Sequence, residues 1–484
     1  MAEQLKPDIC VIGAGSGGLS IAAGASQFGL SVVVVERGRM GGDCLNFGCV
    51  PSKALIAAAR RKHAIETAAP FGIEASAPRV VFAAVNAHVR GVIDAIAPND
   101  SVERFTAMGV RVVQRAGKFR DPRTLVAGDV EIKARKFVIA TGSSPAVPPI
   151  PGLAETPYFT NETLFENTEL PRHLIIIGGG PIGLEMAQAH RRLGARVTVV
   201  EAMTPFARDD PELAGFVLAQ LETDGVRILS GATVSAVAAT KAGVAVTVKT
   251  EAEKNGAGKT EKGEIDLRGS HLLVATGRAA NVNNLGLEAA GVTFDRRGIK
   301  VNKRLKTSNS RIYAIGDVTG GLQFTHAANY HAGLVLRHIM FRLPVKVRED
   351  CIPWVTYTDP ELAWVGLGEE AAKKAHGNIR ILRWPFGEND RAQAERQTAG
   401  LVKVITTTKG KVLGAGIAGA NAGEFIGPWV RAVTFGEKVS ALTGPIVPYP
   451  TIAEINKRVA YTYYTPLLEH SRLPGIARWI ARHF

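Results

Sequence analysis

Two cysteines, Cys44 and Cys49, have the spacing and the neighbours of a redox-active pair. Residues 41–53 read GGDCLNFGCVPSK, so four residues separate the two cysteines. Pro51 suits the first turn of a helix, where its missing N–H costs no hydrogen bond, and we expect a helix to begin close to Cys49. The positive end of that helix would favour a thiolate. Such a pair can form a disulfide that accepts electrons; from the spacing alone, two buried thiols or half of a metal site are the alternatives.

A glycine-rich motif precedes this pair in the arrangement that a bound dinucleotide requires. The apolar run 8–12 predicts a buried strand, which leads into GAGSGG at 13–18 and an alanine-rich helix. A second apolar run, 31–35, ends at Glu36. In such a βαβ unit, Gly13, Gly15 and Gly18 allow the backbone to approach a pyrophosphate, and Glu36 accepts ribose hydroxyls. Cys10 lies in the first strand and is expected to be a small core residue.

The same unit occurs a second time, which predicts two bound nucleotides. An apolar run at 174–177 leads into GGGPIG at 178–183 and a helix through Ala189, and the run 197–200 ends at Glu201. The residues expected to contact the second nucleotide are Gly178, Gly180, Gly183 and Glu201. The Glu201 carboxylate can accept the ribose hydroxyls, and it would repel a 2′-phosphate.

The segment 41–53 resembles the redox-active segment of the FAD-dependent pyridine nucleotide-disulfide oxidoreductases. This family includes dihydrolipoamide dehydrogenase, glutathione reductase and mercuric reductase. The resemblance covers both cysteines, the glycine before Cys49 and the Pro-Ser-Lys after it, and it extends over nearly the whole chain. It implies that the first unit holds FAD and the second a nicotinamide cofactor. We favour NADH over NADPH because no arginine directly follows Glu201, although Arg208 is close enough in sequence to reach back.

Further segments resemble other motifs of this family. YAIGD at 313–317 resembles the second FAD motif, in which the aspartate binds the ribityl chain, and ATGR at 275–278 is mirrored by ATG at 140–142. Thr325 is a plausible N-cap of a helix whose start faces the flavin in the family. His326 is expected to pack rather than to contact flavin. The resemblance adds these cofactor-binding residues: Gly42, Lys53, Thr141, Gly142, Gly277, Arg278, Gly316, Asp317 and Ala327.

The resemblance also assigns catalytic roles. In the family, residues at the positions of Lys53 and Glu185 meet as an ion pair beside flavin N5, where hydride arrives. Cys49 would be the thiolate against the flavin, and Cys44 would face the electron acceptor. The family members also form homodimers, in which the partner subunit completes the site.

The main departure from the family is Tyr449. Dihydrolipoamide dehydrogenase and glutathione reductase have a histidine followed by Pro-Thr, with a glutamate five positions after the histidine, but residues 449–454 here read YPTIAE. A phenol with a reference pKa near 10 is a poor base, so exchange with lipoamide or glutathione should be slow. Glu454 keeps the glutamate position, and with a water molecule it could replace the histidine in a small-disulfide reductase.

Mercuric reductase also carries a tyrosine in this region, but it delivers its metal through two adjacent cysteines near its C-terminus. Tyr461, Tyr463 and Tyr464 occupy the corresponding tail here and are expected at a dimer interface. An N-terminal metal-capture domain is also missing, and no metal site is predicted. The expected function is therefore that of a mercuric-reductase-like enzyme that passes electrons to an unidentified small molecule. Soft-metal reduction, small-disulfide reduction and a membrane-surface NADH:quinone-type reductase are the alternatives.

These motifs predict an α/β fold with two Rossmann-like dinucleotide-binding domains and a C-terminal α+β dimerisation domain. The expected boundaries are 1–150 for the first part of the FAD domain, 151–278 for the NAD domain, 279–348 for the second part of the FAD domain, and 349–484 for the dimerisation domain. The segment 148–152, PPIPG, is expected to be a linker, and the lysine-rich stretch 251–263 a hairpin loop.

The composition limits the range of partners. The 484 residues carry a net charge of +14, but the basic residues are scattered and no nucleic-acid-binding motif accompanies them. The first residues lack a signal-peptide layout and no long apolar run occurs, so we expect a cytoplasmic protein. The C-terminal tail mixes cationic and large apolar residues on a short predicted helix, and it could contact anionic lipid or cover part of a dimer surface. These residues are Arg472, Arg478, Trp479, Ile480, Arg482 and Phe484.

Overall fold

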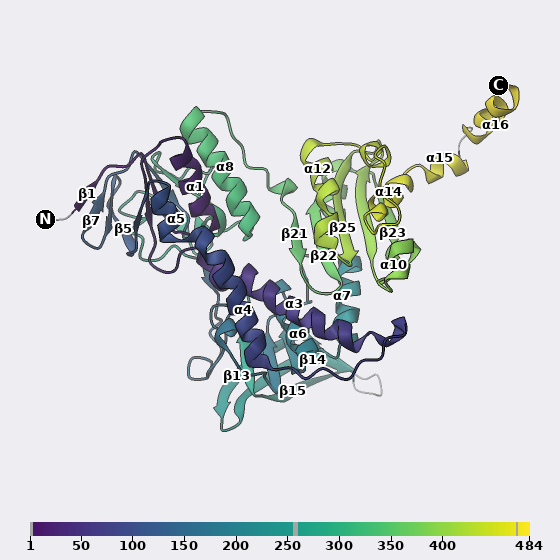
Figure 1. Cartoon of the computed structure of the whole chain (residues 1–484), viewed down its shortest axis with the longest axis horizontal. Coiled ribbons are helices and arrows are strands. Elements are labelled where there is room, and N and C mark those ends of the chain that lie inside the picture. The colour runs from purple at the N-terminus through teal and green to yellow at the C-terminus, as the bar shows by residue number, and fades with distance from the viewer. Residues whose placement is uncertain (1–2, 255–259, 471–472) are drawn as a thin grey trace. The chain divides into compact units, whose positions relative to one another are not determined.

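The computed structural model describes residues 3–254, 260–470 and 473–484 (Figure 1). The chain divides into two compact units, each described by itself below. Unit 1 holds Met1–Pro205 and Val226–Val347, and unit 2 holds Phe206–Gly225 and Arg348–Phe484. The segment Phe206–Gly225 therefore belongs to unit 2, although it lies inside the sequence range 151–278.

A five-stranded parallel sheet forms the first nucleotide-binding fold of unit 1. Every residue of its two central predicted strands is buried, which is typical of parallel strands covered on both faces. Helix α1 (Ser16–Gln27) follows the first of these strands and packs against α8 (Thr325–Phe341). The strand order is β20 (Ile312–Ala314), β8 (Lys136–Ile139), β2 (Ile9–Ile12), β3 (Val32–Val35) and β4 (Val110–Val113).

A four-stranded parallel sheet forms the second nucleotide-binding fold of unit 1. Its central strand is again wholly buried and leads into α6 (Pro181–Leu193). Gly194 ends this helix in the left-handed conformation, as is common at helix C-termini. The strand order is β12 (Arg227–Ser230), β11 (Arg196–Glu201), β10 (His173–Ile177) and β16 (His271–Val274). The two predicted βαβ units are thus confirmed.

One antiparallel sheet and one mixed sheet complete most of unit 1. The antiparallel sheet consists of β13 (Ala232–Thr240), β14 (Gly243–Lys254) and β15 (Thr260–Gly269). The hairpin loop expected over 251–263 is too long, because strand pairing continues until Lys254 faces Thr260. Polar residues can continue a strand when their backbone groups pair with the neighbouring strand, as they do here. The turn, 255–259, lies outside the described residues. The mixed sheet has the order β1 (Glu3–Leu5), β7 (Val130–Ile132), β6 (Thr124–Ala127) and β5 (Gly117–Asp121), and in it β1 pairs parallel with β7.

Three further helices of unit 1 position the predicted redox residues. Helix α2 (Gly42–Asn46) is short and begins after Gly41, whose φ of +84° favours glycine. Helix α3 (Cys49–Glu66) begins at the second redox cysteine, as predicted, and packs against α6 and α4 (Phe82–Ile96). In Figure 1 the long helices α3 and α4 lie beside α6.

Unit 2 is built on a five-stranded antiparallel sheet. Helices α7 (Pro211–Thr223), α12 (Gly427–Phe435) and α14 (Glu454–Tyr461) pack against this sheet, and the buried Trp429 lies in the core that α12 and α14 form with it. The strand order is β21 (Trp354–Thr356), β22 (Glu361–Gly366), β25 (Val412–Gly419), β24 (Leu401–Thr407) and β23 (Ile379–Pro385). This is the predicted α+β domain.

The C-terminal tail forms two short helices, α15 (Thr465–His470) and α16 (Leu473–His483). The predicted tail helix therefore exists, while Arg472 lies outside the described residues. In the ranges that the structure describes, none of the helices has the length and apolar character needed to cross a membrane.

Candidate active site

The two redox cysteines lie at the end of one helix and the start of the next. Cys44 is in α2 and Cys49 is the first residue of α3. Gly48 between them allows a tight turn, because a Cβ there would come within 2.8 Å of the Asp43 carboxylate. Both sulfurs are thiols in the structure, and their side chains hydrogen-bond to each other. The geometry brings together two groups that can form a disulfide without moving a whole helix.

The surroundings of the two sulfurs differ, and they favour a thiolate at Cys49. The hydrogen bond from Cys44 lowers the pKa of Cys49 to about 6; burial opposes this shift, while Thr325 and the Lys53 ammonium add to it. The same hydrogen bond and burial raise the pKa of Cys44. The reduced pair therefore holds its negative charge on Cys49 and its proton on Cys44.

Thr325 is a site residue that the sequence did not identify as such. It was predicted to be an N-cap, but this is wrong: Phe324 is the cap residue, and Thr325 is the first residue of α8. The Thr325 hydroxyl lies 3.6 Å from the Cys49 sulfur, across 276 residues of sequence. His326 stacks on the Phe324 ring, with ring centroids 5.3 Å apart. The sequence contains one sign of this role, namely a hydroxyl side chain at the start of a predicted helix.

Lys53 and Glu185 form an ion pair, as expected from their positions in the sequence. The Lys53 ammonium lies 2.8 Å from a Glu185 carboxylate oxygen, and Glu185 is buried at 6% exposure. The packing of α3 on α6 brings them together. Because Lys53 follows Cys49 by four residues on α3, both side chains lie on one face of the helix. The pair thus places a fixed positive charge one turn from the sulfur.

Arg278 connects the segment around the first cysteine with the predicted FAD residue Asp317. Its guanidinium lies 3.2 Å from the Asp43 carboxylate and donates to Ser143 Oγ at 2.7 Å. Ser143 in turn donates to Asp317 Oδ2 at 2.6 Å, and burial raises the pKa of Asp317. Asn161 also donates to Asp43, at 3.1 Å. Arg278 and Asp317 were predicted, whereas the three residues that join them to the redox segment were missed.

The first glycine motif leaves open space above the start of α1. Gly13 has a φ of +105°, and a Cβ there would lie 2.3 Å from the Ala140 carbonyl oxygen. A Cβ on Gly18 would lie 1.9 Å from the Gly13 carbonyl oxygen. At Gly15, by contrast, the nearest atom would be Gly42 Cα at 3.9 Å. The backbone is thus closely packed where α1 meets the strand before it, and it leaves open space at the N-terminus of α1. A dinucleotide pyrophosphate fits this arrangement.

The second glycine motif repeats this geometry at the start of α6. Gly178 has a φ of +115°, and a Cβ there would lie 2.4 Å from the Ala275 carbonyl oxygen. A Cβ on Gly183 would lie 2.1 Å from the Gly178 carbonyl oxygen, but one on Gly180 would meet nothing within 4 Å. The second site therefore also has the open cradle that a pyrophosphate requires.

The two acidic residues at the strand ends are held in the same way. Glu36 accepts a hydrogen bond from the Ala14 backbone N–H, and Glu201 from the Gly179 backbone N–H, each at 2.6 Å. In both residues the other carboxylate oxygen accepts from the backbone N–H two residues further along, at 2.7 and 2.8 Å. Both carboxylates are thus fixed at the edge of their glycine motif. Arg208, considered as a partner for a 2′-phosphate, belongs to unit 2.

The remaining predicted cofactor residues lie in unit 1, most of them in two Thr-Gly turns. Strand β17 (Arg278–Ala280) pairs antiparallel with β9 (Ser143–Pro145), so that the Thr-Gly turns before them lie at opposite ends of this pair. The turn glycines Gly142 and Gly277 have φ values of +68° and +128°. Thr141 donates to the Asn281 carbonyl at 2.9 Å. Gly316, also at positive φ, and the wholly buried Ala327 complete the set.

Tyr449 and Glu454 belong to unit 2. Tyr449 is 67% exposed, and its hydroxyl donates to Asp390 Oδ2 at 2.8 Å, which raises the pKa of the phenol. Glu454 lies 2.7 Å from the Arg458 guanidinium. Their assignment to the redox reaction stays a prediction. Among the three tail tyrosines, Tyr463 packs within the chain, with the Arg380 guanidinium 4.2 Å from its ring centre.

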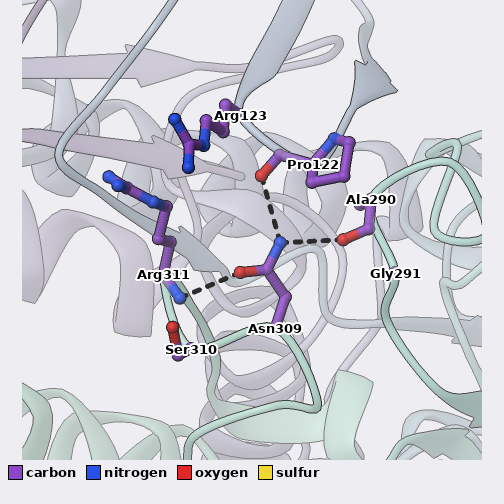
Figure 2. A pocket seen from close by; sticks show the side chains of 7 residues that line it. All are labelled: Pro122, Arg123, Ala290, Gly291, Asn309, Ser310 and Arg311. Atoms are coloured by element: carbon purple, nitrogen blue, oxygen red, sulfur yellow. Dashed lines mark hydrogen bonds between the residues drawn. The ribbon is translucent and has the colours of Figure 1, made fainter.

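A pocket of about 350 Å³ in unit 1 is lined by none of the predicted site residues (Figure 2). Asn309 lies at its centre and donates to the carbonyls of Pro122 and Ala290 at 3.0 and 2.8 Å. It also accepts from the Arg311 backbone N–H at 2.9 Å. The Asn309 amide thus serves to hold three loops together.

Two dinucleotide-binding folds, a dithiol at a helix start and a lysine–glutamate pair beside it define an oxidoreductase that links a nicotinamide nucleotide to a dithiol. Residues 7–332 match the family described as pyridine nucleotide-disulphide oxidoreductase, and residues 352–460 match the dimerisation domain of the same family. The chain belongs to this family. FAD and a pyridine nucleotide are the cofactors of the family, the protein is an FAD-dependent NAD(P)H oxidoreductase, and the dimerisation domain indicates a homodimer.

Similar proteins include enzymes with different acceptors. The chain is 36% identical over 477 residues to the mercuric reductase of Streptomyces lividans, covering 97% of this chain and 98% of that protein. It is 35% identical over 458 residues to the dihydrolipoyl dehydrogenase of Thermus scotoductus, covering 92% and 95%. LpdA from Mycobacterium tuberculosis has a similar structure, with a TM-score of 0.84 and 26% identity over 95% of this chain and 99% of that one. The HOCl-induced flavoprotein disulfide reductase RclA from Escherichia coli, in complex with Cu(II), has a TM-score of 0.81 and 27% identity over 93% and 99%.

Proposed function

We propose that this protein passes electrons from NADH, through FAD, to the Cys44–Cys49 disulfide and on to a small-molecule acceptor. The observation that supports this most is the asymmetry of the dithiol, in which Cys49 is acidic and Cys44 keeps its proton. FAD, when bound, takes up hydride from the nicotinamide and supplies an electron pair to the disulfide. The glycine motifs at the starts of α1 and α6 would hold the two nucleotides.

The protein residues around the sulfurs control charge and protons. The Lys53 ammonium, fixed at 2.8 Å by Glu185, stabilises negative charge that develops one helix turn away. The Cys44 thiol retains the proton and, once deprotonated, is the sulfur that attacks or binds the acceptor. Asp317 and Arg278 would orient the ribityl side of the flavin site, and Glu201 would accept hydroxyls of the adenosine ribose of the nicotinamide nucleotide. The carboxylate of Glu201 disfavours a 2′-phosphate, which supports NADH.

We propose that electron transfer to the acceptor requires no general base from the protein. The Tyr449 hydroxyl donates a hydrogen bond to Asp390, which raises the pKa of the phenol, so the phenolate that could act as a base is even less available than in free tyrosine. The similarity to mercuric reductase supports a thiol-seeking soft cation as one acceptor. The alternative is a small disulfide such as lipoamide, with Glu454 in place of the missing histidine; the similarity to dihydrolipoyl dehydrogenase supports it.

Anaerobic titration with NADH tests the dithiol mechanism. The purified holoenzyme should be yellow, and two electrons should produce a long-wavelength absorbance band from a thiolate beside the flavin. Cys49→Ser should abolish that band. A protein without FAD, or a spectrum that this substitution leaves unchanged, would refute the mechanism. Turnover with dihydrolipoamide, oxidised glutathione, Hg²⁺ and quinones then identifies the acceptor class.

Tyr449→His tests the assignment of the missing base. If the phenol is what prevents proton transfer, the histidine variant should gain lipoamide activity while its FAD content stays the same, since general bases contribute about 10²-fold or more. Tyr461→His is the control, because it adds a histidine elsewhere in unit 2. High lipoamide activity of the unmodified enzyme would contradict the proposal.

Delivery of electrons at a membrane surface is a second candidate function, and helix α16 supports it. Ile476, Trp479 and Ile480 are 52%, 56% and 48% exposed. Helical spacing places these three on one face and Arg478 and Arg482 on the opposite side, an arrangement that suits anionic lipid. A quinone would then be the acceptor.

Sedimentation with vesicles tests this second candidate. The holoenzyme should bind phosphatidylglycerol vesicles at low salt and not phosphatidylcholine vesicles. Ile480→Glu should abolish the binding, whereas Phe435→Glu, which changes an exposed apolar residue outside α16, should not. Equal binding by the Ile480 variant would exclude a role for this helix.

A further inference from the structure

The Thr325 hydroxyl is positioned by α8 to serve the redox cysteines and not its own helix. Phe324 precedes it in extended conformation and supplies no side-chain cap, so the helix start makes no use of the threonine oxygen. That oxygen lies 3.6 Å from the Cys49 sulfur and also hydrogen-bonds to the Cys44 side chain. Across the described residues, these two sulfurs are its hydrogen-bond partners.

A single hydroxyl proton can be donated to one sulfur at a time, and it will be donated to the charged one. Reduction of the disulfide breaks the S–S bond, takes up two electrons from the reduced nicotinamide by way of FAD, and takes up one proton at Cys44. Cys49 is left as the thiolate. A hydrogen bond to an ionised acceptor is about twice as strong as one to a neutral acceptor, so the hydroxyl stabilises the reduced pair more than the disulfide.

Two helix N-termini meet at this sulfur. Helix α3 begins at Cys49 itself, and α8 begins at Thr325, so backbone dipoles from two helices of 18 and 17 residues direct their positive ends toward the same few atoms. The hydroxyl proton adds a directed donor to this field. Together the two helix starts and the hydroxyl favour negative charge on Cys49.

We propose that Thr325 is a further catalytic residue, whose hydroxyl donates to the Cys49 thiolate and thereby makes the Cys44–Cys49 disulfide easier to reduce. The inference rests on the proposed dithiol function. It assigns to the start of α8 a direct contact with the reacting sulfur.

The test compares Thr325→Val, which keeps the shape and removes the hydroxyl, with Thr325→Ser, which keeps the hydroxyl. Each holoenzyme is equilibrated anaerobically with mixtures of reduced and oxidised dithiothreitol, and thiols are trapped by alkylation and counted by mass spectrometry. Loss of a hydrogen bond to a charged group should lower the equilibrium constant for reduction about tenfold in the valine variant, equivalent to about 30 mV. The serine variant should stay within about twofold of the unmodified enzyme.

The outcomes separate this inference from the function on which it rests. If the unmodified enzyme never forms a Cys44–Cys49 disulfide in these mixtures, the dithiol function itself fails. If the disulfide forms, but the valine variant matches the unmodified enzyme or the serine variant shifts as far as the valine variant, the hydroxyl has only a packing role and the inference is overturned. Thr325→Ala is measured alongside, and it replaces the valine variant if the latter loses FAD.

Discussion

At the scale of single residues, the chemistry depends on the difference between two neighbouring sulfurs. Cys44 and Cys49 are the same residue type five positions apart, yet the second begins a helix, receives the hydrogen bond of the first and lies one turn from Lys53. The hydrogen bond from Cys44 is the main cause that lowers the pKa of Cys49 to about 6, and Thr325 and Lys53 add to it, so Cys49 is ionised at neutral pH while Cys44 is not.

The ionisation of Cys49 should be visible in the pH dependence of the reduced enzyme. Because the pKa is lowered to about 6 from the usual 9, the thiolate band should persist from pH 9 down to pH 7 and disappear as the pH falls below about 6. Lys53→Met removes a positive charge and should move this midpoint upward. Lys62→Met, near the far end of α3, should leave it unchanged. An equal shift in both variants, measured by absorbance after anaerobic reduction, would contradict the role of Lys53.

Nucleotide preference should depend on the charge of Glu201. Its carboxylate is held by the Gly179 and Met203 backbone N–H groups, so Glu201→Gln keeps one of these contacts and removes the repulsion of a 2′-phosphate. We expect the ratio of kcat/KM for NADPH to that for NADH to rise about tenfold, which equals about 1.4 kcal/mol. Glu222→Gln, at an exposed position, is the control. An unchanged ratio would show that other groups determine the preference.

At the scale of elements, α7 is the clearest case of a helix whose place in the fold is set by charge. Its N-terminal Asp210 and Glu212 lie 2.8 and 3.0 Å from the Lys403 ammonium on β24, and Glu369 lies 3.3 Å from it. Lys403 is only 3% exposed. Burial works against the charged amine, but the hydrogen bonds to the carboxylates raise the pKa of Lys403. This cluster anchors α7 to the sheet of unit 2.

Removal of that lysine should destabilise unit 2. Lys403→Met leaves buried carboxylates without their cation, and we expect a loss of about 3–5 kcal/mol in the free energy of unfolding. Lys373→Met is the matched control, because it removes an exposed partner of the same Glu369 and should cost less than about 1 kcal/mol. Urea unfolding followed by tryptophan fluorescence measures both. Similar losses in the two variants would argue against the anchoring role.

At the scale of the whole molecule, unit 1 carries buried histidines that make its stability depend on pH. Burial lowers the pKa of His190 and of His331 to about 4 in each case. His331 accepts a hydrogen bond from the Gly316 N–H at 3.2 Å, and its other ring nitrogen is buried with no partner among the described residues. In the unfolded chain both imidazoles would take up a proton near pH 6.5. Unfolding is therefore favoured at acid pH.

The free energy of unfolding of unit 1 should fall as the pH is lowered from about 6.5 to about 4, and then level off. Each histidine contributes at most about 3 kcal/mol to this loss, since its pKa is about 2.5 units lower in the folded state. His331→Asn keeps an acceptor for Gly316 and should flatten the dependence between pH 7 and pH 5. His376→Asn, at an exposed position of unit 2, should not. A profile unaffected by the His331 change would mean that carboxylates dominate acid unfolding.

The sequence by itself determined the features that depend on residues close together in the chain. The two βαβ units, the start of α3 at Cys49 and the position of Lys53 all follow from apolar runs, from glycines that need positive φ, and from a proline in the first turn of a helix. These features act over a few residues and are readable from the chain alone. The family resemblance added Glu185 and Asp317, because their offsets from the glycine motifs are fixed.

Only the tertiary structure decided which distant residues meet. Thr325 was assigned to its own helix by sequence and instead contacts a sulfur 276 positions away. Asp43 reaches Arg278, and α7 joins the sheet of unit 2 although it lies between strands of the second nucleotide-binding fold. A hydroxyl at a helix start can bond to its own helix or to a distant group, and the packing of the chain decides which. No local pattern contains that choice, because it depends on what the rest of the chain places nearby.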